Sequence, residues 1–254
     1  MRWICFLFVF VLMGCEVDQL PACEGSGLEG QVCKEYQYLF GVYNGVNEYE
    51  YDLDLGLLSV ITTKTDNGSV QGVKSYFYNQ QGLLTSILFK DSKGQLLNEK
   101  ILSYNNLGYL EREVISGDSK TEHKYYYEGG LLKVEVFSSE NTIDWVDSIE
   151  HYSGTQDVYR KLRYVNNSLK EITYFDIFSN NVLEERVINN SGRIQSKKVI
   201  RFNDRQEKIE EIVYSSDNTL VNKVIYTYFD SKLDRVDKFN ELEEEYEVLT
   251  YKRF

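Results

Sequence analysis

Short clusters of turn-forming residues interrupt the chain at nearly constant intervals. They are rich in Gly, Asn, Asp and Ser and lie near Gly56, Gly68, Gly82, Gly94, Gly108, Asp118, Gly130, Asn141, Gly154, Asn167, Asn180, Gly192, Arg205, Asp217 and Ser231. Their mean spacing of about 12.5 residues leaves about eight residues for each segment between turns, which is the length of a β-strand. Two intervals make a unit of about 25 residues, a repeat length typical of stacked supersecondary units.

The segments between the turns have the composition and the periodicity of β-strands. The chain contains 21 Tyr and 13 Phe but one Pro. Val224, Tyr226 and Tyr228 fall on one face of a strand, because side chains alternate between the two faces of a pleat. No segment shows a sustained apolar stripe with the helical period of 3.6 residues. We therefore expect an all-β domain over residues 36–254.

Several units share the spacing Tyr-x-Tyr-(Asp/Asn)-x-x-Gly-x-Leu. Tyrosines on one face supply large buried area, and Asn or Asp followed by Gly suits the positive φ of a tight turn. The spacing resembles the YD (RHS-type) repeats of bacterial surface and secreted proteins, and is similar to hairpin repeats of exported Bacteroidetes lipoproteins. The resemblance covers about residues 49–240 and is carried by residues 49–58, 76–84, 102–110, 125–132 and, in degenerate form, 226–233.

The pattern predicts a long antiparallel β-meander of about 14–16 strands built from hairpin repeats of about 25 residues. Open sheets rarely exceed about ten strands without curling, splitting or closing. We expect a curled or coiled sheet, because the units repeat at one uniform step. A propeller would group strands in fours, and no such supergroup is visible. A lipid-embedded barrel needs an apolar outer band, whereas residues 197–198 and 207–211 place charge on both faces.

The first residues of the chain have the three-part plan of an export signal. Arg2 supplies a positive charge, residues 4–13 are apolar, and Gly14 is a small residue at the expected cleavage site. The alternative is an uncleaved membrane helix, but ten or eleven residues rise only about 16 Å, roughly half the thickness of the hydrocarbon core. We therefore assign residues 1–14 to a signal peptide.

The segment Leu12-Met13-Gly14-Cys15 resembles the lipobox of bacterial lipoproteins, although Met13 is an unusual occupant of its position. The resemblance implies cleavage before Cys15, a thioether-linked lipid on its sulfur and acylation of the new amino terminus. Several acyl chains give stable membrane anchoring, whereas one gives only marginal binding. An ordinary signal peptide with an incidental cysteine is the alternative. The resemblance implies a protein of the bacterial cell envelope, anchored by lipid at the outer membrane on its periplasmic or surface face.

Two cysteines remain after lipidation and removal of the signal peptide. Cys23 and Cys33 lie in the segment 15–35, which we interpret as a lipidated tether. In an exported protein such a pair is expected to form a disulfide, and two free thiols are the alternative. A zinc site is disfavoured, because it needs about four ligands and both histidines lie far away in the sequence.

The charge balance restricts the classes of partner. The chain has 40 acidic and 28 basic residues and a net charge of −12. Such a surface repels phosphate backbones, so we expect no nucleic-acid binding. It also repels anionic lipid, so the lipid anchor must provide membrane attachment. A protein or a glycan remains as the expected partner.

No catalytic, metal or cofactor motif stands out. The patterns Gly-x-Ser-x-Gly and His-Glu-x-x-His are absent. We interpret His123 and His151 as polar-face residues, residues 52–56 as a turn rather than a calcium loop, and the acidic run 241–247 as a solvated final strand or short terminal helix. Trp145 and the tyrosines could stack against sugar rings or a protein partner.

We therefore expect a membrane-anchored, non-catalytic binding or scaffold module. The alternatives are a periplasmic partner protein of the immunity type, and a cell-envelope enzyme acting on glycans through carboxylates.

Overall fold

The computed structural model describes residue 23, residues 28–179 and residues 181–254. Every regular element in this part of the chain is a β-strand. The described residues contain no helix with the length and apolar character needed to cross a membrane. The strands are β1 (Val32–Leu39), β2 (Val42–Asp52), β3 (Leu57–Thr65), β4 (Val70–Tyr78), β5 (Leu84–Asp91), β6 (Leu96–Tyr104), β7 (Leu110–Ser116), β8 (Lys120–Glu128), β9 (Leu131–Ser139), β10 (Thr142–His151), β11 (Val158–Val165), β12 (Ser168–Ser179), β13 (Val182–Asn189), β14 (Ile194–Phe202), β15 (Lys208–Ser215), β16 (Leu220–Phe229), β17 (Lys232–Phe239) and β18 (Glu245–Arg253).

A recurrent hairpin turn explains the regular spacing of the sequence. In the turn after β4, the Asn79 Oδ1 accepts the N–H groups of Gln81 and Leu83, at 2.9 and 3.0 Å. Gly82 adopts a φ of 76°, which a glycine reaches without steric cost. The same side-chain cap closes the turns that begin at Asp91, Asn105, Asn189, Asn203 and Asn240. Each predicted turn among the described residues lies between two strands. The turn predicted near Asn180 has its central residue outside the described residues.

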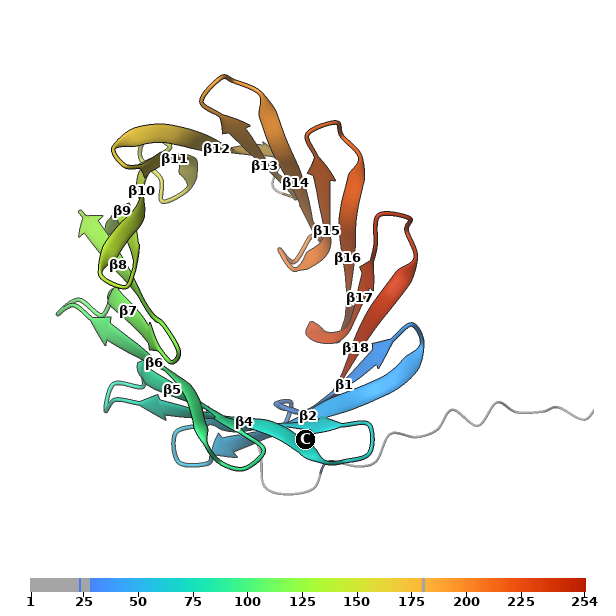
Figure 1. Cartoon of the computed structure of the whole chain (residues 1–254). Coiled ribbons are helices and arrows are strands. Elements are labelled where there is room, and N and C mark those ends of the chain that lie inside the picture. Colours follow the sequence, from blue (N-terminus) through green and yellow to red (C-terminus); the bar gives the residue numbers. More distant parts are fainter. Residues whose placement is uncertain (1–22, 24–27, 180) are drawn as a thin grey trace, which may run out of the picture.

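The expected all-β antiparallel meander is confirmed, and its curled sheet closes into a barrel. Each strand pairs antiparallel with the next, and β1 also pairs with β18, so that the 18-stranded sheet has no free edge (Figure 1). Tyr36 pairs with Thr250 across this seam and with Val46 on the other side of β1. Closure satisfies backbone groups that an open sheet leaves unpaired at its two edges. Closure could not be predicted from the sequence, because the pattern of one hairpin does not show which distant strands meet.

The expected count of about 14–16 strands was also too low, because two turns contain a single turn-forming residue rather than the usual cluster. The β1–β2 turn holds Phe40 and Gly41, and Phe40 adopts a φ of 48°. The β17–β18 turn has Glu243, with a φ of 59°, at the position that Gly82 occupies after β4. Residues 32–35, which we had assigned to the tether, lie in β1. The acidic run 241–247 forms this last turn and the start of β18.

One face of the sheet carries the repeated tyrosines, and we name it the tyrosine face. Tyr76 and Tyr78 of β4 lie on it, and cross-strand register places His123 and Tyr125 of β8 on the same face. On this face, side chains meet across an intervening strand. The rings of His123 and Trp145 are 5.2 Å apart although β9 separates their strands. Because two strand spacings amount to about 9.6 Å, these side chains converge, which identifies the tyrosine face as the concave, inner face of the barrel.

The barrel is wide, and its inner face is not packed into a solid core. In the described residues the buried apolar side chains are few, namely Cys33, Tyr36, Val114, Ile149, Ile200, Ile212, Val236 and Val248. Inward side chains such as Tyr76, Phe137 and Trp145 are only half-buried. Barrels of 16–18 strands are wide enough to leave an aqueous interior, whereas eight-stranded barrels are filled by side chains. The tyrosine face is therefore accessible from the interior.

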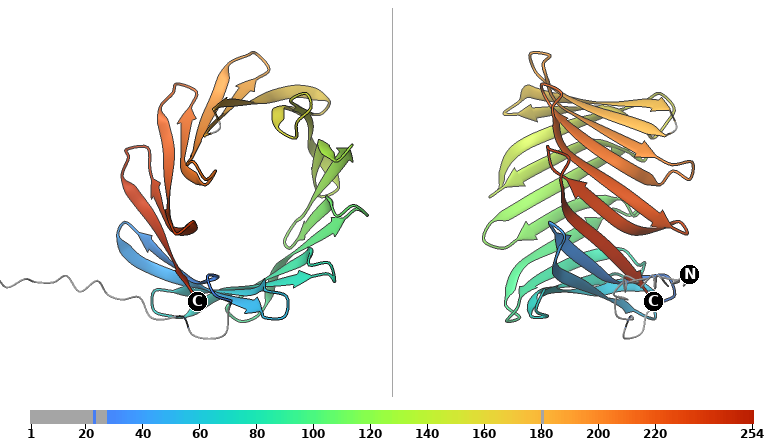
Figure 2. Two further views of the ribbon diagram at one scale, coloured as in Figure 1. Left: turned by 180° about the vertical axis from the view of Figure 1, so that it is seen from behind. Right: turned by 90° about the vertical axis from the view of Figure 1, so that its right-hand side faces the viewer.

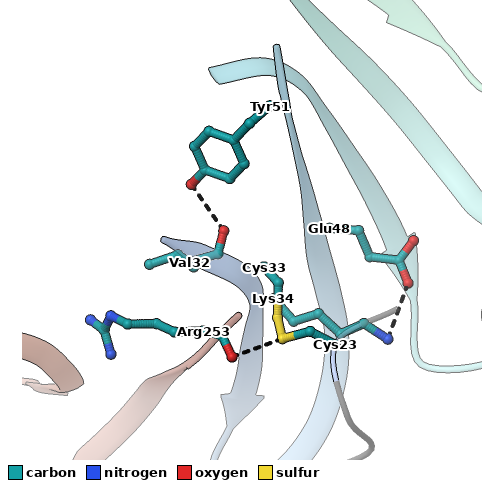
Figure 3. The surroundings of a disulfide bond; sticks show 7 residues. All are labelled: Cys23, Val32, Cys33, Lys34, Glu48, Tyr51 and Arg253. Carbon is teal, nitrogen blue, oxygen red and sulfur yellow. Dashed lines mark hydrogen bonds and ion pairs between the residues drawn. A yellow bond between two sulfur atoms is a disulfide. The ribbon is translucent and has the colours of Figure 1, made fainter. Parts of the chain in front are cut away.

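The barrel has two distinct rims. The C-terminal rim contains the start of β1 and the end of β18, and the other end of the barrel is the opposite rim (Figure 2, right view). At the C-terminal rim Cys23 and Cys33 form a disulfide, with Cα atoms 6.0 Å apart (Figure 3). Residues 1–14, expected to be a signal peptide, and Cys15, the expected lipid-attachment site, lie outside the described residues.

Candidate binding wall inside the barrel

An aromatic cluster lies on the tyrosine face over strands β8, β9 and β10. Cross-strand register places His123 beside Phe137, and Phe137 beside Trp145. Phe137 and Trp145 stack at 5.4 Å with an interplanar angle of 20°. The His123 ring meets both edge-on, with centroids at 5.0 and 5.2 Å. The result is an apolar surface with several ring planes.

A network of charged side chains adjoins the aromatic cluster. Asp147 on β10 is fully buried, with 0% exposure. Its carboxylate accepts two hydrogen bonds from the Arg163 guanidinium on β11, both at 2.9 Å. The Lys161 Nζ lies 3.2 Å from Asp147 and donates to Glu135 on β9 at 2.8 Å. Each charge within the network therefore has a partner of opposite sign, as a buried carboxylate requires.

Arg163 joins the two groups. Its guanidinium lies 4.3 Å from the centroid of the Trp145 ring, within the range of a cation–π contact. The hydrogen bond to Asp147 raises the pKa of Arg163 above its ordinary value. The guanidinium is therefore held charged and in place against the indole. We name the aromatic cluster and this network together the binding wall.

Tyr125 extends the binding wall with a hydroxyl group. Burial raises the pKa of Tyr125 to about 12, and the nearby carboxylates of Glu113 and Glu135 add to the shift. The hydroxyl is therefore protonated at neutral pH, and it lies 3.2 Å from the Nδ1 of His123. The Nε2 of His123 is buried and has no hydrogen-bond partner in the described part of the chain. The binding wall thus combines apolar ring faces with several polar groups.

The two histidines occupy different environments. His123 packs against Phe137 and Trp145 within the aromatic cluster. The interpretation of His123 as a residue of a polar face was therefore wrong. His151 lies at the end of β10, with its Nε2 2.8 Å from the Leu132 carbonyl oxygen and its Nδ1 2.9 Å from that of Gln156. In the hairpin repeat this position is a tyrosine: the Tyr78 hydroxyl donates to the Leu58 carbonyl at 2.8 Å. His151 therefore replaces the repeat tyrosine and has a structural role, in contact with a backbone carbonyl of another strand.

Two further questions from the sequence concern metal sites, at residues 52–56 and elsewhere in the chain. The Asp52 Oδ1 accepts the N–H groups of Asp54 and Leu55, which confirms the interpretation of this segment as a turn. No group of three or more potential metal ligands occurs within residues 28–179 and 181–254 or at Cys23. A shallow groove of about 200 Å³ is lined by Ser103, Glu111, Arg112, Lys124, Tyr125 and Tyr126, and cross-strand register places Ser103, Arg112 and Lys124 on the outer face, opposite the binding wall.

Sequence reasoning singled out Trp145 but missed Asp147 and Arg163. The available signal was a pair of period-two patterns on consecutive strands, with Trp145 and Asp147 on one and Lys161 and Arg163 on the next. Only the register of β10 against β11, in which Asp147 faces Arg163, brings these residues together. A shift of one residue would have placed them on opposite faces of the sheet.

Comparisons with known proteins give a distant likeness to solved structures only. No protein-family model matches the chain, and no curated protein matches it. A porin-like protein from Bacteroides uniformis aligns over 92% of this chain and 100% of its own, with 12% identity and a TM-score of 0.49. A porin-like protein from Bacteroides vulgatus aligns over 88% and 98%, with 9% identity and a TM-score of 0.37. A TcdB2–TccC3–Cdc42 complex aligns over 79% of this chain and 13% of that one, with 14% identity and a TM-score of 0.40.

Proposed function

We propose that this chain is a non-catalytic, lipid-anchored barrel of the bacterial cell envelope that binds a glycan on its inner wall. The observation that carries the proposal is the binding wall, where stacked Phe137 and Trp145 adjoin the ion pair of Asp147 and Arg163. Such a surface suits a ligand that has both an apolar face and hydroxyl groups.

A sugar ring has this combination of groups. Its axial C–H bonds form an apolar face that can lie on an indole or phenyl ring, and its hydroxyls need donors and acceptors at the ring edge. Binding sites are commonly lined by aromatic side chains with a small number of placed polar groups. The binding wall offers Trp145 as the ring, and the Arg163 guanidinium and the Tyr125 hydroxyl as polar groups.

The outer face of the barrel supports tethering rather than insertion into lipid. Glu48 on β2 forms ion pairs with Lys34 on β1 and Lys64 on β3. Asp176 and Arg186 form a similar pair on the outer face of β12 and β13. Charged side chains at mid-strand positions of a lipid-facing surface cost roughly 2–4 kcal/mol each for Lys and Arg. The lipobox-like segment ending at Cys15 would instead supply the membrane attachment.

Tryptophan fluorescence tests the glycan proposal. A protein produced from residue 16 onward contains Trp145 as its one tryptophan. Titration with oligosaccharides from cell-envelope polysaccharides should change its emission with a saturable dependence on concentration. Phe137→Ala, which removes the stacked neighbour, should weaken binding at least about tenfold, a loss of about 1.4 kcal/mol.

A matched substitution on the outer face provides the control. Phe77 on β4 is 46% exposed, and Phe77→Ala should leave glycan affinity unchanged. Equal effects of the two substitutions, or no saturable response to any oligosaccharide, would contradict the proposal. Release of new reducing ends during the titration would instead support the alternative of a glycan-acting enzyme.

The anchor is tested separately by metabolic labelling with a fatty-acid analogue. The full-length chain should carry the label and Cys15→Ala should not. Label on the Cys15→Ala variant would refute the lipobox assignment.

A further inference from the structure

We propose that the C-terminal rim faces the lipid surface, so that the opposite rim is the open entrance to the barrel. The inference rests on the proposed lipid anchor at Cys15. It adds an orientation, which follows from where the tether joins the barrel and from the side chains at that rim.

The tether joins the barrel beside the seam of β1 and β18. The disulfide joins Cys23 to Cys33 in β1, and the Cys23 Sγ lies 3.1 Å from the carbonyl oxygen of Arg253 (Figure 3). The Gly30 N–H donates to the Phe254 carbonyl, and the Phe254 N–H donates to the Gln31 carbonyl. These contacts hold the point of entry at the C-terminal rim.

The length of the tether limits how far this rim can lie from the lipid. From Cys15 to Cys23 the chain advances eight residues, which span at most about 29 Å when fully extended. A strand of nine residues, such as β4 or β14, is itself roughly 30 Å long. Because strands of a barrel tilt by roughly 35–45°, the two rims are roughly 21–25 Å apart. An upright barrel with its opposite rim on the membrane would therefore need a tether that runs almost straight along the wall. The C-terminal rim can instead approach the lipid without extending the tether.

Exposed apolar side chains at the C-terminal rim suit contact with a lipid interface. They lie in or beside its turns around the barrel and include Leu28, Leu53, Leu55, Leu107, Phe178 and Phe229. Apolar side chains of this kind gain free energy when they enter the boundary between headgroups and acyl chains. The opposite rim also exposes apolar residues, among them Phe40 and Leu242, so the tether rather than the apolar surface selects the rim.

Quenching of tryptophan by spin-labelled lipids tests the orientation. The lipidated protein is reconstituted on the outside of phosphatidylethanolamine–phosphatidylglycerol vesicles in a Trp145→Phe background. Leu107→Trp reports on the C-terminal rim and Leu242→Trp on the opposite rim, at positions that are 78% and 71% exposed. Quenching should be at least about twofold stronger for Leu107→Trp, because only that side chain would reach the interface. Leu53→Trp provides a second reporter of the C-terminal rim if Leu107→Trp does not fold.

The outcomes separate this inference from the anchor on which it rests. Protein that does not sediment with the vesicles refutes the lipid anchor and the orientation together. Protein that sediments but shows equal quenching at both rims, or stronger quenching for Leu242→Trp, refutes the orientation alone.

Discussion

At the scale of single residues, one carboxylate organises the inner wall. Asp147 is the one side chain in the described part of the chain with 0% exposure that carries a charge. It binds Arg163 through two hydrogen bonds and lies 3.2 Å from Lys161. Because Arg163 also lies against Trp145, the position of the indole depends on this carboxylate.

Asp147→Asn should therefore destabilise the protein and weaken ligand binding together. The substitution removes the bidentate partner of Arg163 and leaves it only the more distant Glu171 carboxylate, 3.9 Å from its Nη1. Breaking a buried pair costs about 3–5 kcal/mol, and we expect about 3 kcal/mol, because Glu171 remains and Arg163 and Lys161 retain some solvent contact. The free energy of unfolding in urea measures the effect. Glu150→Gln provides a control on the same strand, since its partner Arg160 lies on the more exposed outer face and the loss should stay below about 1 kcal/mol. Equal losses in the two variants would contradict this role for Asp147.

This site could be predicted only in part from the sequence. Trp145 stands out because tryptophan is rare in the chain, and the period-two alternation places it on one face of a strand. Its partners Arg163 and His123 come from other strands, β11 and β8, and no local pattern shows that their side chains point to the same side. The concave side of the sheet also becomes apparent only after closure.

At the scale of the secondary-structure element, turn chemistry determines where the strands end. The same Asn or Asp cap, followed by a residue with positive φ, closes six of the hairpins. Sequence reasoning located five of these turns because clusters of capping residues and glycines are local signals. It missed the β1–β2 and β17–β18 turns because each contains a single turn-forming residue, Gly41 or Asn240, rather than a cluster.

Glu243→Gly should consequently stabilise the protein. Glu243 adopts a φ of 59° in the position that Gly82 occupies after β4, and a left-handed conformation costs a residue with a Cβ about 1 kcal/mol relative to glycine. We expect a gain of up to about 1 kcal/mol in the free energy of unfolding, measured by denaturant titration. Gly82→Ala should cause a loss of similar size, since the added Cβ would meet only the Leu57 Cδ1, at an ordinary contact distance of 3.8 Å, and only the backbone is strained. A loss of stability in Glu243→Gly would show that the glutamate makes a compensating contact in the native state.

At the scale of the whole molecule, closure takes the place of a large core. Few side chains are buried, and stability depends on continuous pairing around the ring. The sequence predicts strand pairing between neighbours along the chain, because each hairpin is local. It does not predict the pairing of β1 with β18, since their contacts join segments more than 200 residues apart and have no signal in either segment alone.

A break in β1 should therefore open the barrel rather than cause a local defect. Tyr36→Pro removes a backbone donor from a strand that is paired on both sides, and a proline in the interior of a sheet is not accommodated. The free edges of β2 and β18 would then pair with other molecules, since unpaired edges promote association. We expect light scattering and size-exclusion chromatography to show oligomers in place of a monomer. Tyr36→Phe separates this effect from any role of the hydroxyl and should remain monomeric.

Proline in a turn provides the matched control for this prediction. Gln80 lies in the turn after β4, at the second position of a turn that begins at Asn79, where the φ of proline is favoured. Gln80→Pro should therefore leave the barrel monomeric with nearly unchanged stability. If Tyr36→Pro also remained a monomer with native ellipticity, continuous pairing at the seam would not be what holds the barrel closed. The disulfide and the contacts of Phe254 with residues 30–31 would then carry that role.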